Sequence, residues 1–124
     1  MIGALLGRTE EDVIVPTVCG CKIGCRSVDF QIDALARLGA SVELREMKRE
    51  SAYFAHAHRG LKGTIVRLPY PSIGATENTI LAAVSARGTT LVQNAAVEPE
   101  VMELIVFLQK IGAQISVEAD RTIR

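Results

Sequence analysis

The sequence predicts an α+β fold in which helices pack on short strands. Two observations support this prediction. In three segments the apolar residues recur at intervals of three and four, as they do along one helix face, and short runs rich in β-branched residues lie between these segments. The chain has 124 residues, of which 48% are hydrophobic, and this is enough for one ordinary core. We therefore expect residues 1–124 to form a single domain.

The first strand is expected at residues 12–17, where the apolar run DVIVPT contains a proline near its end. A loop rich in glycine and cysteine follows it. The helical spacing of apolar residues then begins near Ser27 and ends at Gly39, a residue type that commonly stops helices. Short strands are expected at residues 42–44 and 52–57.

Residues 64–68 form a further apolar run, and we expect antiparallel pairing among this run and the two strands before it. Pro69 and Pro71 exclude regular structure in the next stretch. A second helix is expected to open near Ser72, because serine is a favoured cap and an apolar face follows it. This helix should stop at Gly88.

The C-terminal third is expected to form a strand, a helix and a hairpin. Residues 89–93 favour a strand, and residues 101–111 carry an apolar helical stripe that ends at Gly112. Residues 113–118 should form the last clear strand. Residues 120–124 should begin its hairpin partner, because aspartate favours a turn while threonine and isoleucine favour a strand.

Two of these segments, residues 28–44 and 101–117, match each other at a constant offset of 73 residues. Seven matches in register exceed what helical patterning alone would give. We therefore expect a protein built by repeating a unit of helix, glycine stop and strand pair. The matched pairs are Val28 with Val101, Leu35 with Leu108, Leu38 with Ile111, Gly39 with Gly112, Ala40 with Ala113, Val42 with Ile115, and Leu44 with Val117.

The charge balance bears on the class of partner. Fourteen basic residues balance fourteen acidic residues, and the basic residues are scattered instead of forming a stripe, so we expect no nucleic-acid partner. The longest apolar runs are far shorter than the roughly 18 residues of a membrane-spanning helix, and the N-terminus lacks the charged leader and cleavage site of a signal peptide. These features predict a soluble cytoplasmic protein without a membrane partner.

Cys19, Cys21 and Cys25 lie within one short stretch, and their chemistry is open to several interpretations. A closed zinc or iron–sulfur site needs four ligands, which would require His56 or His58 in addition, and the C-x-C-x3-C spacing fits no such site. A dithiol redox pair would need a C-x-x-C spacing, which is absent. All three could also be small buried hydrophobic residues, the commonest role of cysteine.

A single reactive thiol is the remaining interpretation, with Cys21 as the candidate. Arg26 and the N-terminus of the following helix would place positive potential beside it, which favours the thiolate and attracts anionic substrates. A second candidate site is the start of the helix at Ser72, where Ile73 and Gly74 would expose amides suited to phosphate. Every capped helix has such amides, so this second pattern alone is weak evidence.

Three separated parts of the chain together resemble one known family. They are GCKIGCRSVDF at residues 20–30, then RGLKG followed by PSIGATEN and LAAVSARGTT, then NAAVEPEV followed by FLQKIGAQIS. In order, and over almost the whole chain, they are similar to the UDP-N-acetylglucosamine 1-carboxyvinyltransferases of the enolpyruvate transferase family. The resemblance implies the repeating helix and strand units of the inside-out α/β barrel of that family, here incomplete.

The resemblance also implies an enzyme that transfers the enolpyruvyl group of phosphoenolpyruvate to UDP-N-acetylglucosamine, the first committed step of peptidoglycan synthesis. That family needs no metal or organic cofactor. By the motif match, Cys21 is the proton donor and the thiol alkylated by fosfomycin, and Arg26 faces the substrate phosphates. The other implied substrate-binding residues are Ser27, Val28, Asp29 and Phe30 at the uridine end, and Ser72, Ile73 and Gly74 at the diphosphate.

The sequence also departs from the family pattern. Ser27 replaces a common proline and Gln31 replaces a common histidine, while Cys19 and Val97 replace a glycine and a basic residue. The family enzyme has two domains, and several of its catalytic residues have no match here, so we expect the isolated chain to lack full activity. The alternative is a non-catalytic UDP-sugar-binding module or a truncated paralogue. We also expect unpaired edges at the first and last strands, which would favour self-association.

Overall fold

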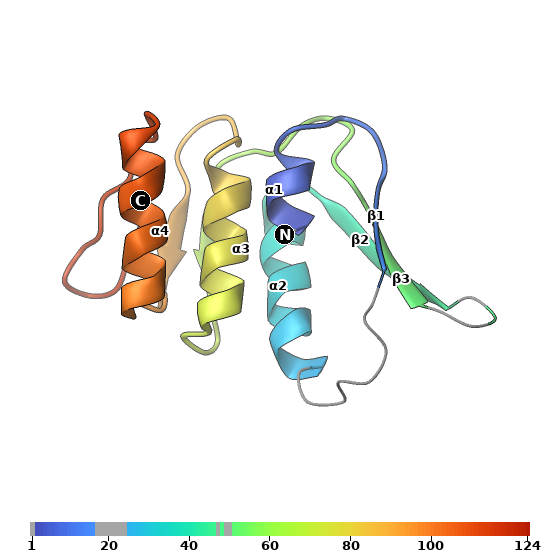
Figure 1. Ribbon diagram of the computed structural model, residues 1–124, viewed down its shortest axis with the longest axis horizontal. Coiled ribbons are helices and arrows are strands. Elements are labelled where there is room, and N and C mark those ends of the chain that lie inside the picture. The colour runs from blue at the N-terminus through green and yellow to red at the C-terminus, as the bar shows by residue number, and fades with distance from the viewer. Residues whose placement is uncertain (1, 17–24, 47, 49–50) are drawn as a thin grey trace.

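The main feature of the molecule is a row of three parallel helices (Figure 1). The computed structural model describes residues 2–16, 25–46, 48 and 51–124. The three helices are α2 (Cys25–Arg37), α3 (Ile73–Ala83) and α4 (Pro99–Lys110). α3 packs on both of the others, and in Figure 1 all three begin at the lower end of the view. Helices and short strands occur along the whole chain, which confirms the predicted α+β class.

Two of the predicted helices end just before a glycine, as the sequence predicts. Gly39 follows α2 with a φ of 99°, and Gly112 follows α4 with a φ of 107°. Both values lie in the left-handed region, where only glycine is unstrained, so these residues stop the helices as expected. Pro99 occupies the first turn of α4, where its fixed φ suits the helix and its missing N–H group costs no helical hydrogen bond.

The helix α3 is shorter than predicted. It ends at Ala83, although the sequence pattern predicts an end at Gly88. The reason is a pair of backbone hydrogen bonds outside the helix. The N–H of Arg87 donates to the carbonyl of Leu61 at 2.9 Å, and the carbonyl of Arg87 accepts from the N–H of Gly63 at 2.7 Å. These bonds draw the chain away from the helical path before the glycine is reached.

A three-stranded antiparallel sheet lies at one end of the helix row (Figure 1). It contains β1 (Val13–Pro16), β2 (Ser41–Glu46) and β3 (Ser51–His56), in the order β1-β3-β2. The antiparallel pairing predicted for residues 42–44 and 52–57 is therefore confirmed. As predicted for the first strand, β1 occupies an edge of its sheet.

A second sheet contains β4 (Ile65–Arg67) and β5 (Leu91–Gln93), which pair in parallel with Val66 opposite Val92. The antiparallel pairing predicted for residues 64–68 is therefore wrong. Two parallel neighbours need a crossover connection, and α3 supplies it between these strands. The sequence run alone identified a strand, but the connection through the helix decided its partner.

The segment after α4 turns back on itself beside β5. The N–H of Arg124 donates to the carbonyl of Ser116, and the N–H of Ser116 donates to the carbonyl of Arg124, both at 2.9 Å. The predicted hairpin is therefore confirmed, although its ladder consists of isolated bridges. Ile123 bridges to Val92 on one side and to Val117 on the other. The free edge predicted at the last strand is wrong, because this strand is paired on both sides.

The short helix α1 (Ile2–Leu6) is not predicted by the sequence, because five residues give almost no helical signal of their own. It packs on α3. A Cβ atom on Gly3 would collide with the backbone carbonyl of Asn78, and one on Gly7 would collide with the side chain of Ser85. The close approach of α1 and α3, and of the residues that directly follow them, therefore requires glycine at both positions.

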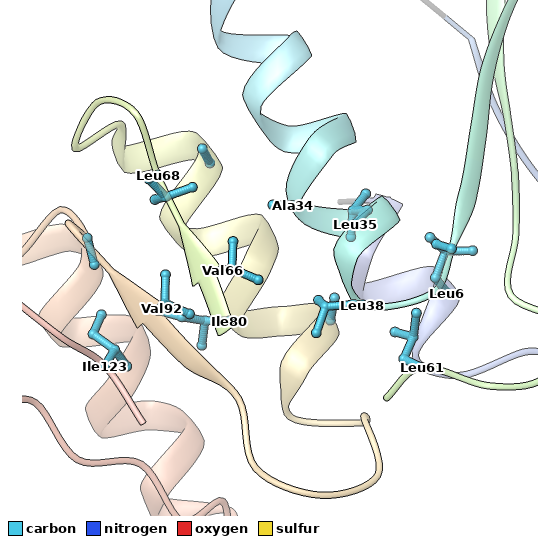
Figure 2. Packing of buried hydrophobic residues seen from close by; sticks show 14 of the residues in the cluster. Leu6, Ala34, Leu35, Leu38, Leu61, Val66, Leu68, Ile80, Val92 and Ile123 are labelled. Atoms are coloured by element: carbon cyan, nitrogen blue, oxygen red, sulfur yellow. The ribbon is translucent and has the colours of Figure 1, made fainter. Parts of the chain in front are cut away.

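Buried hydrophobic side chains from the helices and from both sheets form one cluster. Figure 2 shows members of it from four elements: Leu35 from α2, Ile80 from α3, Val66 from β4 and Val92 from β5. This packing fixes the helices relative to the strands and therefore fixes the helix ends as well. Over the part of the chain that the structure describes, every helix is too short or too polar to cross a bilayer.

Candidate functional site

The candidate site lies at the end of the molecule where α2, α3 and α4 begin (Figure 1). The first-turn N–H groups of a helix have no acceptor within the helix, so each of these ends carries a partial positive charge. α3 and α4 also follow the carboxyl ends of the parallel strands β4 and β5. Ligands commonly bind beyond the carboxyl ends of parallel strands. This end of the molecule is therefore suited to an anionic ligand.

The first turn of α3 contains the predicted residues Ser72, Ile73 and Gly74. The hydroxyl of Ser72 accepts a hydrogen bond from the N–H of Ala75 at 3.3 Å, which confirms the predicted N-cap. Ile73 and Gly74 are exposed, and their N–H groups point out of the helix start, as in any first turn. Two first-turn amides are thus available beside an exposed glycine, whose missing side chain permits close approach.

The loops that follow β4 and β5 are joined to this turn by side chains that the sequence reasoning missed. The hydroxyl of Thr76 donates to the carbonyl of Ser72 at 2.7 Å and accepts from the N–H of Ala96 at 2.9 Å. The side-chain amide of Asn94 donates to the carbonyl of Leu68 at 2.8 Å. Asn94 has a φ of 56°, a conformation that asparagine tolerates better than most residues. The asparagine after the strand was therefore the one sequence signal that could have indicated this turn.

The first turns of α2 carry the other predicted substrate residues. The opening turn of α2 contains Arg26, Ser27 and Val28, and Asp29 and Phe30 follow it. Asp29 is exposed, whereas the half-buried ring of Phe30 packs against the hydrophobic cluster.

The predicted catalytic residue Cys21 and its neighbour Cys19 lie outside the described residues, so the role of the cysteine stretch stays a prediction. His56 and His58 stack on each other with ring centroids 4.1 Å apart, and so lie on one face. The described residues hold no group of three or more His, Cys, Asp or Glu side chains that could bind a metal ion. Nε2 of His58 lies 3.7 Å from a carboxylate oxygen of Asp12.

The two predicted substrate segments are brought together by a side-chain contact between α2 and α3. The amide nitrogen of Asn78 donates to the side-chain oxygen of Gln31 at 3.2 Å. The other end of the Gln31 amide, Nε2, lies 3.3 Å from the point where a Cβ on Gly74 would stand. Gln31 directly follows the motif on α2, and Gly74 is in the first turn of α3. The structure thus connects the end of one motif to the start of the other.

A cleft of about 530 Å³ lies at the opposite end of α3. It is lined by Ile80 of α3, by Val84 directly after that helix, and by Ile115 and Arg124 from the C-terminal hairpin. Thr90, which is 8% exposed, also lines it, and its hydroxyl has no hydrogen-bond partner among the described residues. None of the predicted site residues that the structure describes lines this cleft. Volume alone therefore does not identify the site in this molecule.

Comparison with known proteins connects this arrangement to named relatives. Among curated proteins, the UDP-N-acetylglucosamine 1-carboxyvinyltransferase of Protochlamydia amoebophila is 68% identical over 124 residues, which are 100% of this chain and 27% of the relative. The protein of the same name from Chlamydia pneumoniae is 50% identical over 99% of this chain and 26% of the relative. The chain thus spans about a quarter of the length of the curated relatives it matches.

Solved structures and a family model agree with these matches. An EPSP synthase from Acinetobacter baumannii superimposes with a TM-score of 0.75 at 20% identity, covering 98% of this chain and 26% of that chain. The enolpyruvyl transferase NikO from Streptomyces tendae gives 0.71 at 20% identity, covering 98% of this chain and 28% of that chain. At this identity the likeness concerns the fold alone, and it confirms the predicted enolpyruvate transferase fold. Because the family model matches residues 1–124, the chain belongs to the EPSP synthase (3-phosphoshikimate 1-carboxyvinyltransferase) family.

Proposed function

We propose that this chain is part of an enzyme that transfers the enolpyruvyl group of phosphoenolpyruvate to UDP-N-acetylglucosamine. The names of the two curated relatives support UDP-N-acetylglucosamine as the acceptor and a carboxyvinyl group as the group transferred. Phosphoenolpyruvate as the donor is what the sequence resemblance implies. The observation that carries the proposal is the contact between the two matched motifs, since the amide of Gln31 joins the motif helix α2 to the first turn of α3. The reaction would be the first committed step of peptidoglycan synthesis, in the cytoplasm, and would serve cell-wall growth and cell shape.

The sugar nucleotide would bind across the starts of α2 and α3. The first-turn amides of Ile73 and Gly74, with Ser72 capping the helix, would receive the diphosphate at the positive helix end. Arg26 would add a charge-assisted contact to the phosphates. The rest of the motif turn, Ser27 to Phe30, would line the uridine. The diphosphate is thus the part of the ligand that would contact both α2 and α3.

The chemistry would proceed by addition and elimination. The 3-hydroxyl of the sugar adds to C2 of phosphoenolpyruvate while Cys21 delivers a proton to the methylene carbon, and the hydroxyl proton passes to a base outside this chain. The tetrahedral adduct then loses inorganic phosphate and one proton of its newly formed methyl group, which restores the double bond. The electron balance of these steps needs no redox partner, and the resemblance implies no metal or organic cofactor.

We propose that residues 1–124 form one domain of repeated units, with segments 28–44 and 101–117 as copies. The chain spans about a quarter of its curated relatives, so the other substrate-holding groups would come from the rest of the longer protein. The exposed edge of β1 would allow isolated copies of the chain to associate, because an edge strand presents unpaired backbone groups.

Alkylation by fosfomycin tests the catalytic assignment. In the purified chain with UDP-N-acetylglucosamine present, we expect intact-mass spectrometry to show one adduct in the wild type and none in Cys21→Ala. Cys19→Ala and Cys25→Ala are matched controls that should keep the adduct, because each removes a neighbouring thiol. An adduct that persists in Cys21→Ala would contradict the role of Cys21.

A non-catalytic UDP-sugar-binding module is the second candidate, because the first-turn amides of Ile73 and Gly74 suit a diphosphate whether or not a reactive thiol lies beside them. The two candidates differ in reactivity. Native mass spectrometry should show one UDP-N-acetylglucosamine per chain under both, whereas adduct formation at Cys21 is expected only for a chain that carries the working thiol. Binding without alkylation would therefore favour the module.

A further inference from the structure

A buried asparagine on α3 connects three helices through its side-chain amide. Asn78 is 3% exposed. Its oxygen Oδ1 accepts a hydrogen bond from the backbone N–H of Gly3 in α1 at 2.8 Å. Its nitrogen Nδ2 donates to Oε1 of Gln31 in α2 at 3.2 Å. The amide thus accepts on one side and donates on the other.

The backbone of α1 fixes which way round the Asn78 amide lies. A backbone N–H can only donate, so the group facing Gly3 must be the asparagine oxygen, and the nitrogen must face α2. Rotating the amide by half a turn would set two donors against each other in a buried place and would break both hydrogen bonds. The absence of a side chain on Gly3 keeps the two helices close enough for this contact.

The same argument fixes the amide of Gln31. Because Nδ2 of Asn78 is a donor, Gln31 must turn its oxygen toward it, and its own nitrogen Nε2 is then directed to the other side. On that side lies Gly74, and a Cβ placed there would stand 3.3 Å from Nε2. The hydrogen-bond polarity set by α1 therefore determines that an N–H donor, and not a carbonyl oxygen, lies beside the first turn of α3.

We propose that Asn78 is a positioning residue for sugar-nucleotide binding, which holds the amide of Gln31 so that its N–H group faces the diphosphate subsite. This inference rests on the proposed function, because the diphosphate at the first turn of α3 is part of that proposal. An N–H donor at this point complements an anionic group, whereas an oxygen would repel it. Gln31 is then the contacting residue, and Asn78 acts only through it.

The main test is a pair of isosteric changes measured by calorimetric titration of UDP-N-acetylglucosamine into the purified chain. Gln31→Glu keeps an acceptor for Asn78 and replaces the N–H donor by a charged oxygen. Asn78→Asp keeps the acceptor for Gly3 and removes the donor, so Gln31 turns its nitrogen toward the new carboxylate and its oxygen toward Gly74. We expect each change to weaken binding by at least about tenfold.

Matched controls separate positioning from folding. Gln114→Glu adds the same charge at an exposed place that lines the cleft at the other end of α3, and should leave affinity unchanged within about twofold. Uridine, which has no phosphate, should bind the wild type and Gln31→Glu alike. Thermal unfolding of each variant shows whether the fold persists, and Gln31→Glu, at a half-buried position, covers the case in which Asn78→Asp fails to fold.

A double-mutant cycle tests whether Asn78 acts through Gln31. Gln31→Met removes the side-chain amide without adding charge, and in that background Asn78→Asp should cause no further loss of affinity. Equal losses in both backgrounds, or unchanged affinity in Gln31→Glu and Asn78→Asp, would overturn the inference and leave the proposed function standing. A wild-type chain that does not bind UDP-N-acetylglucosamine would instead overturn this inference together with the proposed binding of the sugar nucleotide by residues 1–124 alone.

Discussion

The helices α2 and α4 have matching sequences at an offset of 73 residues, but their last apolar side chains have opposite environments. Leu38, directly after α2, is 0% exposed, whereas the matched Ile111, directly after α4, is 66% exposed. Leu38 lies among the side chains of the hydrophobic cluster, which Figure 2 shows. Ile111 lies at the outer end of the helix row, together with the exposed Phe107. The sequence pattern therefore sets where a helix ends, whereas the elements packed beside the helix decide whether its apolar face is buried.

The strands after these two helices differ in the same way. β2 pairs with β3 over six positions, and β1 covers the other side of β3. The corresponding segment after α4 pairs through isolated bridges. The segment with more neighbours is the more regular one. A similar pattern in sequence thus gives similar backbone turns but unequal packing.

Truncation of the two matched side chains should give the largest contrast. Leu38→Ala removes a fully buried side chain and leaves a cavity, so the free energy of unfolding should fall by about 2 to 5 kcal/mol. Ile111→Ala, its control, should change stability by less than about 0.5 kcal/mol, because that side chain is already mostly in water. Urea denaturation measures both. Equal losses of unfolding free energy in the two variants would show that the difference in burial does not affect stability.

The glycines that end the two helices should give equal effects, in contrast to the side chains before them. Gly39 and Gly112 have φ values of 99° and 107°, and an added Cβ would meet open space at Gly112 and only one distant carbonyl at Gly39. Replacing either by alanine should cost about 1 to 2 kcal/mol through backbone strain alone. Thermal unfolding of the two variants gives the comparison. A loss at one position only would mean that the two turns are not equivalent.

An exposed ion pair provides the smallest difference between the helices. In α2, Nε of Arg37 lies 3.0 Å from a carboxylate oxygen of Asp33, and the matched positions in α4 are Lys110 and the uncharged Val106. Asp33→Asn should lower stability by about 0.3 to 0.5 kcal/mol at low salt and by nothing measurable in 1 M salt. Val106→Asp should add a pair of similar strength to α4. Stability changes that do not depend on salt would mean that the ion pair is not their cause.

Much of the fold follows from local sequence signals. The starts and ends of α2 and α4 are set by apolar spacing and by glycines that adopt positive φ, and these signals act within a few residues. The pairing of β4 with β5 could not be predicted in this way, because a short apolar run does not encode its partner. The helix α1 was also beyond local reasoning, since its formation depends on packing against α3.

In the candidate site, too, local features could be predicted from the sequence and long-range contacts could not. The cap at Ser72 could be predicted because serine at a helix start has a local meaning. Asn78 gave no such signal, since a polar residue inside a helix usually faces water, and its partners Gly3 and Gln31 are 75 and 47 residues away in sequence. Motif resemblance located the segments, but only the folded chain shows which amide faces which.

The parallel arrangement of α2, α3 and α4 has a consequence for the speed of encounter. Each helix start carries about half a unit of positive charge, and in Figure 1 three such starts lie at one end of the molecule. Fields of the same sign add, so a polyanion diffusing nearby is drawn to this end before it makes any contact. The association rate constant of such a ligand should therefore fall as ionic strength rises, while its dissociation rate constant changes less.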